Sequence, residues 1–124
     1  MINRTNLDIG FAGEKIAQEF LINQGYVILY TNWRFMKDEI DIIAEKENEL
    51  IIVEVKTRTY NDVIQPEEAV TKQKQNFIIR ATNSFIEEND IDKYVRFDIV
   101  SVIMGKTENT ISHIIDAFYP VRKN

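Results

Sequence analysis

Two short charged patterns interrupt apolar stretches in the first half of the sequence. Glu39 and Asp41 flank an isoleucine, and Glu54 and Lys56 flank a valine, each within a run of apolar residues typical of a buried strand. Burying such charges costs free energy unless a partner compensates them. Because residues two apart project from the same face of a strand, each pattern places its two charged side chains together.

Pairing of these two strands through the polar turn at residues 45–49 would make Asp41 and Glu54 neighbours, with Lys56 beside them. That combination suits hydrolysis of a phosphodiester. Two carboxylates supply the oxygen ligands that Mg²⁺ prefers, and the cation binds the scissile phosphate and lowers the pKa of a bound water. Lys56 would orient that water or stabilise developing charge. The alternative is a set of solvated surface charges, and spacing alone does not decide between the two.

Apolar periodicity predicts the elements that position these residues. Helices are expected over about residues 8–24, ending at Gly25, and over about residues 67–89, after Pro66. Strands are expected over residues 27–35, 39–44, 50–57, 95–104 and 110–118. The order is α-β-β-β-α-β-β, a single α/β domain over residues 1–124 whose first three strands form an antiparallel meander. Strict alternation divides the second strand into two faces, namely Glu39, Asp41 and Ile43 on one and Ile40, Ile42 and Ala44 on the other.

Glu14 is a further candidate, on the first predicted helix. It lies in a stripe with Gly10, Ala17 and Leu21 at the edge of the apolar face, so its carboxylate can lean toward the sheet. A solvent-exposed glutamate is the alternative.

Composition narrows the classes of function. The net charge of −5 argues against a generally basic surface that coats nucleic acid, although a cation held by carboxylates supplies positive charge where a phosphate would sit. The chain has no cysteine and a single histidine, His113, which makes a zinc site improbable and removes cysteine nucleophiles. We find neither a signal-peptide pattern nor an apolar run of membrane-spanning length, and therefore expect a cytoplasmic protein without a membrane partner.

Five stretches together resemble a known family. They read, in order, GFAGEKIAQEFLINQGYVIL, NWRFMKDEIDIIA, IIVEVKTR, EAVTKQKQ and RFDIVSV, and the resemblance extends over about residues 10–118. They resemble the YraN-like family of uncharacterised bacterial proteins, which is similar to the Holliday-junction-resolvase branch of the PD-(D/E)xK nuclease superfamily.

The resemblance implies a fold and an activity. The fold would be a restriction-endonuclease-like, three-layer α/β sandwich with a mixed central sheet. The activity would be that of an endonuclease dependent on Mg²⁺ or Mn²⁺ that hydrolyses DNA and is selective for branched or junction DNA. Junction cleavage needs two active sites, so a homodimer is expected if that activity holds.

Carried over residue by residue, the resemblance assigns roles to four side chains. The superfamily's acidic motif falls on Asp41, and its E-x-K motif falls on Glu54 and Lys56. The helix glutamate that related resolvases place near the metal falls on Glu14. The implied catalytic residues are Asp41, Glu54 and Lys56, and the implied metal ligands are Asp41, Glu54 and Glu14.

Other positions match the family less directly. Arg58, Lys74 and Gln75 match family residues that would contact nucleic-acid phosphate or brace the site, although the last two also suit a solvated helix. Asp38 stands where the family usually has glycine, either as a turn residue or near the metal. Ile40 stands in place of the superfamily's proline.

Two other classes of function remain open at the level of sequence. One is a non-catalytic module that binds nucleic acid or protein on a nuclease scaffold, which the acidic net charge favours. The other is an RNA-processing nuclease. Asp98 matches the family pattern but is equally compatible with a structural role, and His113 is interpreted as a strand-face or surface residue.

Overall fold

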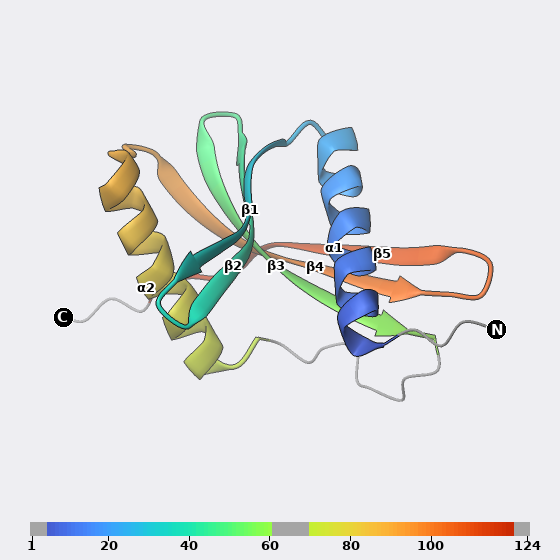
Figure 1. The fold of residues 1–124 in the computed structure, drawn as a ribbon. Helices are drawn as coiled ribbons and strands as arrows, with labels where there is room; N and C mark the ends of the chain where they lie inside the picture. The colour runs from blue at the N-terminus through green and yellow to red at the C-terminus, as the bar shows by residue number, and fades with distance from the viewer. Residues whose placement is uncertain (1–4, 61–69, 121–124) are drawn as a thin grey trace.

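The computed structural model describes residues 5–60 and 70–120. Figure 1 shows their arrangement. The elements are α1 (Asn6–Asn23), β1 (Val27–Phe35), β2 (Asp38–Lys46), β3 (Glu49–Thr59), α2 (Lys72–Asn89), β4 (Tyr94–Met104) and β5 (Asn109–Phe118). The predicted order of helices and strands is confirmed.

The five strands form one mixed sheet in the order β1-β2-β3-β4-β5. β1, β2 and β3 pair antiparallel, as predicted, and β4 and β5 pair antiparallel as well. β3 and β4 pair parallel, which requires a crossover connection, and α2 lies within that connection. β3 is therefore the central strand, with a partner on each side.

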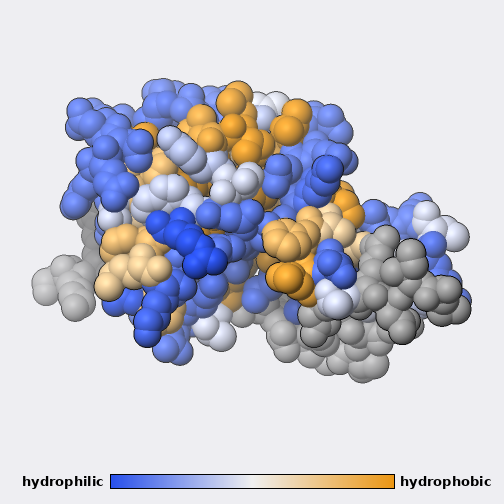
Figure 2. All heavy atoms as spheres, in the orientation of Figure 1, coloured by the Kyte–Doolittle hydropathy of each residue, from blue (hydrophilic) through white to orange (hydrophobic). Residues whose placement is uncertain are grey.

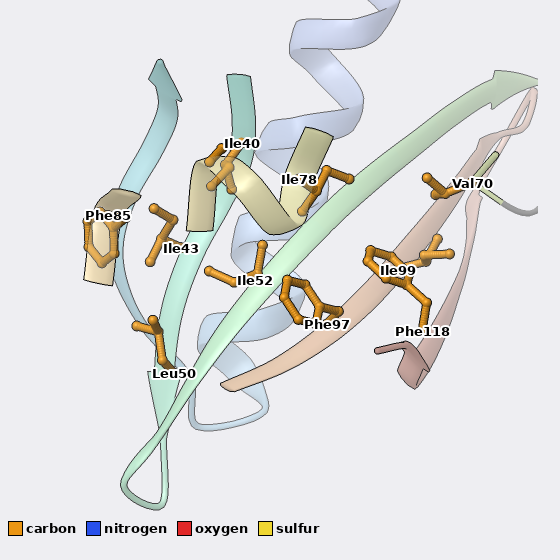
Figure 3. Close-up of a cluster of buried hydrophobic side chains, with 11 residues drawn as sticks. Ile40, Ile43, Leu50, Ile52, Val70, Ile78, Phe85, Phe97, Ile99 and Phe118 are labelled. Atoms are coloured by element: carbon orange, nitrogen blue, oxygen red, sulfur yellow. The ribbon is translucent and has the colours of Figure 1, made fainter. Parts of the chain in front are cut away.

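The helices cover opposite faces of the sheet and make three layers (Figure 1). On one face, Ala17 and Leu21 of α1 pack on Ile51 and Val53 of β3. On the other face, Phe85 of α2 belongs to a second buried cluster, whose side chains are drawn in Figure 3. Alternate residues of β3 thus enter opposite cores, and each fully buried large side chain contributes about 1.5–3 kcal/mol to stability.

Both helices have side-chain caps at their N-termini. α1 begins with a capping box, in which the Asp8 backbone N–H donates to Thr5 Oγ1 at 3.1 Å and the Thr5 N–H donates to Asp8 Oδ2 at 3.2 Å. α2 begins at Lys72, because Thr71 is extended and its Oγ1 accepts from the Lys74 N–H at 3.2 Å. The predicted helix start near residue 67 is wrong, because residues 70 and 71 are not helical. Residues 66–69 lie outside the described residues.

The predicted alternation along β2 is wrong at Ile40. Ile42 and Ala44 join the cluster under α1, as expected of residues two apart, but Ile40 joins Ile43 in the cluster under α2. The side-chain alternation therefore breaks at Asp41. This break separates the regular half of β2 from the half that carries the acidic pattern.

The surface of the described residues is mixed. The face seen in Figure 2 is largely hydrophilic, with apolar side chains in separate patches. Exposed apolar residues include Leu7 and Phe11 on α1 and Met36 in the turn between β1 and β2. Within the described residues, neither helix is long and apolar enough to cross a membrane.

Candidate metal centre

The close crossing of α1 over β3 brings one helix residue to the sheet. A Cβ atom at Gly13 would lie 1.9 Å from Thr57 Oγ1 and 2.6 Å from Thr57 Cβ, so only glycine permits this approach. Glu14 follows Gly13 and lines a pocket between α1 and the sheet. Figure 1 shows the N-terminal half of α1 beside the C-terminal end of β3, where that pocket lies.

The end of the β2–β3 ladder brings the two predicted carboxylates together. The last residues of the paired register are Ile42 and Val53. Beyond this pair, a side chain takes the place of a backbone acceptor: the Val55 backbone N–H donates to Asp41 Oδ2 at 2.8 Å. Glu54, between Val53 and Val55, hydrogen-bonds with Asp41 through its side chain. The sequence-based placement of Asp41 beside Glu54 is confirmed.

These side chains line an open pocket of about 410 Å³. Glu14 comes from α1, Asp41 from β2 and Glu54 from β3, and the wall also includes Thr57. The volume falls within the range of small-ligand sites, and its carboxylates converge from three elements. Such a pocket has room for hydrated ions and for a phosphate group.

The electrostatics of the Asp41–Glu54 pair favour one shared proton. Burial raises the pKa of Glu54 to about 8, and the charge of Asp41 adds to the rise, while Lys74 and Lys56 oppose it. Burial also raises the pKa of Asp41, against the lowering effects of the Val55 N–H and of Lys74. Without a cation, Glu54 therefore holds the proton and donates it to Asp41 at neutral pH.

A third and a fourth carboxylate adjoin Asp41. Oxygen atoms of Glu14, Glu39 and Asp41 all lie within 4.8 Å of one another. With its amide nitrogen turned toward them, Asn32 donates to Glu39 Oε1 at 3.0 Å and to Glu14 Oε2 at 3.1 Å. Burial and Asp41 raise the pKa of Glu14, while the Asn32 amide lowers it. Asp41 is thus shared between Glu54 on one side and these two glutamates on the other.

Two lysines supply the positive charge of the centre. Lys74 of α2 lowers the pKa of both Asp41 and Glu54, and Lys56 of β3 lowers the pKa of Glu54. Lys56 was predicted to act with the carboxylates, and Lys74 was predicted to contact phosphate or brace the site, with a solvated helix position as the alternative. The structure brings both within electrostatic reach of the buried pair.

The remaining predicted residues lie around this group. Arg58 follows Lys56 on β3 and is partly buried. Gln75 donates its amide to the Val70 backbone carbonyl at 2.8 Å, which braces the segment before α2. Asp38 pairs with Phe35 at the turn between β1 and β2.

Sequence reasoning missed the roles of Glu39 and Asn32. The Glu39–Asp41 pattern was a usable signal for Glu39, since alternation placed both on one face. Asn32 gave no comparable signal, because its amide reaches the glutamates only through a left-handed backbone with φ of 52° inside β1.

Asp98 and His113 belong to a separate, structural network. Asp98 is fully buried and accepts from Arg96 Nε at 2.9 Å, Arg96 Nη2 at 2.8 Å and the Asp116 N–H at 3.0 Å, and its Oδ2 lies 2.7 Å from His113 Nε2. Burial would raise the pKa of Asp98, but the hydrogen bonds from His113 and Arg96 outweigh it and hold the pKa below its ordinary value. Arg96 also donates to the Tyr26 hydroxyl at 2.6 Å. The network ties β4 to β5 and to the segment between α1 and β1.

Comparison with known sequences identifies the family. Residues 13–102 match the uncharacterised protein family UPF0102. A UPF0102 protein of Flavobacterium psychrophilum is 48% identical over 112 residues, which cover 90% of this chain and 94% of that protein. Relatives from Bacteroides fragilis and Parabacteroides distasonis are 50% and 46% identical, each over 90% of this chain and 93% of the relative. The predicted YraN-like membership is confirmed, and the chain belongs to the uncharacterised protein family UPF0102, the YraN family.

Proposed function

We propose that the protein is a metal-dependent endonuclease that hydrolyses DNA phosphodiester bonds on a restriction-endonuclease-like scaffold. The observation that carries this proposal is the pair formed by the partly buried Asp41 and the buried Glu54, which lies within the electrostatic influence of Lys56 and Lys74 at the end of the β2–β3 ladder. Buried carboxylates with raised pKa values beside lysines are a costly arrangement for stability alone and a common one at catalytic sites. The order of elements and the mixed sheet agree with that scaffold.

The donor atoms fit Mg²⁺ or Mn²⁺. Asp41 and Glu54 offer carboxylate oxygens in one pocket, and Glu14 and Glu39 extend the set around Asp41. All are hard oxygen ligands, which these ions prefer, and no thiolate is available in the chain. When bound, the cation supplies electrophilic stabilisation of the phosphate and lowers the pKa of an attacking water.

Each side chain then has a defined task. Asp41 is held by the Val55 N–H, which fixes the carboxylate before any ion arrives. Glu54 would act as a ligand in its ionised form, after its proton has passed to solvent water. Lys56, which lowers the pKa of Glu54, orients the attacking water or stabilises the charge that develops on the phosphate. Lys74 neutralises part of the negative charge, and Arg58 lies on the same strand to contact the nucleic-acid backbone.

Selectivity for branched or junction DNA follows from the resemblance to junction resolvases, and two-site cleavage would then use a homodimer. The test is cleavage of labelled single-stranded, duplex, flapped and four-way-junction DNA and of structured RNA, each with Mg²⁺, Mn²⁺ or EDTA. Glu54→Gln and Lys56→Met test the site. Glu88→Gln and Lys72→Met are the matched controls, because both residues are exposed on α2.

Three outcomes separate the candidate functions. Metal-dependent DNA cleavage that is lost in the two site variants and kept in the controls supports the proposal. DNA binding without cleavage by any variant refutes catalysis and supports a non-catalytic binding module. Cleavage confined to RNA supports an RNA-processing nuclease.

A further inference from the structure

Asn32 has an unusual backbone for its place in the sheet. It lies within β1, where Thr31 pairs with Ile42 and Trp33 pairs with Ile40, yet its φ is 52°. A left-handed residue inside a strand is unfavourable for every side chain except glycine, and least so for asparagine. Such a conformation persists only where the surroundings hold it in place.

The side chain of Asn32 shows what this conformation achieves. The amide is assigned by its hydrogen bonds: with the nitrogen turned toward the carboxylates, it donates to Glu39 Oε1 at 3.0 Å and to Glu14 Oε2 at 3.1 Å. Both amide protons are therefore used, one on a glutamate of β2 and one on a glutamate of α1. The amide connects the helix to the β1–β2 pair at the place where the oxygens of Glu14, Glu39 and Asp41 come within 4.8 Å of one another.

The carboxylates need such a donor when no cation is present. Ionised carboxylates this close repel one another, and Glu14 and Glu39 come from different elements, α1 and β2. A neutral amide offers two protons without adding charge, so it holds the oxygens near one another while the charge that attracts a cation is kept.

We infer that Asn32 is a positioning residue of the metal centre, whose amide holds Glu14 and Glu39 within reach of one divalent cation before the cation binds. This inference rests on the proposed metal-dependent function. It predicts that loss of the amide weakens cation binding even where the fold and the backbone conformation are kept.

The test compares two asparagines with left-handed backbones. Asn32→Gly removes the amide and keeps a residue that accepts a positive φ. Asn48→Gly makes the same change at φ of 66° in the turn between β2 and β3, and is the matched control. Calorimetric titration with Mn²⁺ in the absence of DNA gives the dissociation constant of each protein, and melting temperatures in EDTA establish that each is folded.

We expect Asn32→Gly to bind Mn²⁺ at least about tenfold more weakly than the wild type, as is usual when a residue that orients metal ligands is lost. Asn48→Gly should bind like the wild type. Equal affinity of Asn32→Gly and wild type would overturn the inference and leave the proposed function standing. If the wild type itself fails to bind Mn²⁺ and Mg²⁺, the proposed function falls and the inference falls with it. Equal weakening in both glycine variants would assign the effect to general flexibility and also overturn the inference.

Discussion

Substitution of Glu54 by glutamine tests the electrostatics of the centre without requiring a substrate. Glutamine keeps the size and the hydrogen-bonding capacity of the side chain but cannot ionise. The pKa of Glu54 is raised from 4.5 to about 8 in the folded protein, chiefly by burial. A group with a raised folded pKa stabilises the fold below its unfolded pKa, and this contribution is lost as the pH rises through the folded value. Metal-free wild type should therefore lose stability between pH 6 and pH 9.

The size of this loss follows from the two pKa values. One pKa unit corresponds to about 1.36 kcal/mol, so the ionisation of Glu54 removes on the order of 3 kcal/mol from the free energy of unfolding between pH 6 and pH 9. The Glu54→Gln variant cannot ionise at this position and lacks this pH-dependent loss of stability. Asp41, whose pKa is also raised, lowers stability with pH in both proteins. The diagnostic quantity is therefore the difference between the two pH profiles rather than either profile alone.

Urea unfolding in EDTA, followed through the fluorescence of the single tryptophan Trp33, measures both profiles. Starting at pH 6 keeps the protein above its acidic isoelectric point. Added Mg²⁺ should restore the stability of the wild type at pH 9 and have little effect on Glu54→Gln, because the cation binds the ionised carboxylates. Parallel profiles for the two proteins in EDTA would refute the raised pKa of Glu54 and the proton that it is inferred to share with Asp41.

Three further substitutions have defined outcomes. Gly13→Ala forces α1 away from Thr57 and should lower stability by about 1–3 kcal/mol in urea unfolding, whereas Gly10→Ala, where nothing lies within 4 Å of the added Cβ, should not. Asp98→Asn leaves the charge of Arg96 unpaired and should lower the free energy of unfolding by about 3–5 kcal/mol. Because the pKa of Asp98 is lowered in the folded protein, the stabilisation by Asp98 is present above the ordinary carboxyl pKa and is lost as the pH falls through the folded pKa. Acid titration of the wild type should show this loss of stability, and the variant should not. Thr71→Ala removes the N-cap of α2 and should lower the free energy of unfolding by about 1 kcal/mol, whereas Thr71→Asp keeps a capping side chain and should leave the stability unchanged.

The parts of the structure that follow a local period were predictable. Alternating or continuous apolar runs defined every strand to within a few residues, and the short polar turns required β1, β2 and β3 to pair as a meander. The neighbourhood of Asp41 and Glu54 followed directly from that pairing. The catalytic and ligand roles of these two residues stay predictions.

The parts that depend on broken periodicity were not predictable. The alternation of β2 fails at Asp41 because the ladder with β3 ends there, and no residue type marks the end. The start of α2 was misplaced because Pro66 is a favourable first helical residue, whereas the hydroxyl of Thr71 caps the observed helix. Asn32 requires a backbone conformation that tertiary contacts impose.

The central position of β3 has a consequence for synthesis of the chain. All four carboxylates of the centre precede residue 60, so the ribosome delivers them before β4 exists. Until β4 emerges, one edge of β3 has no partner, and its run of isoleucine and valine is exposed in a form that promotes pairing between nascent chains. A chain truncated after β3 would therefore carry every carboxylate of the centre, and we expect it to aggregate.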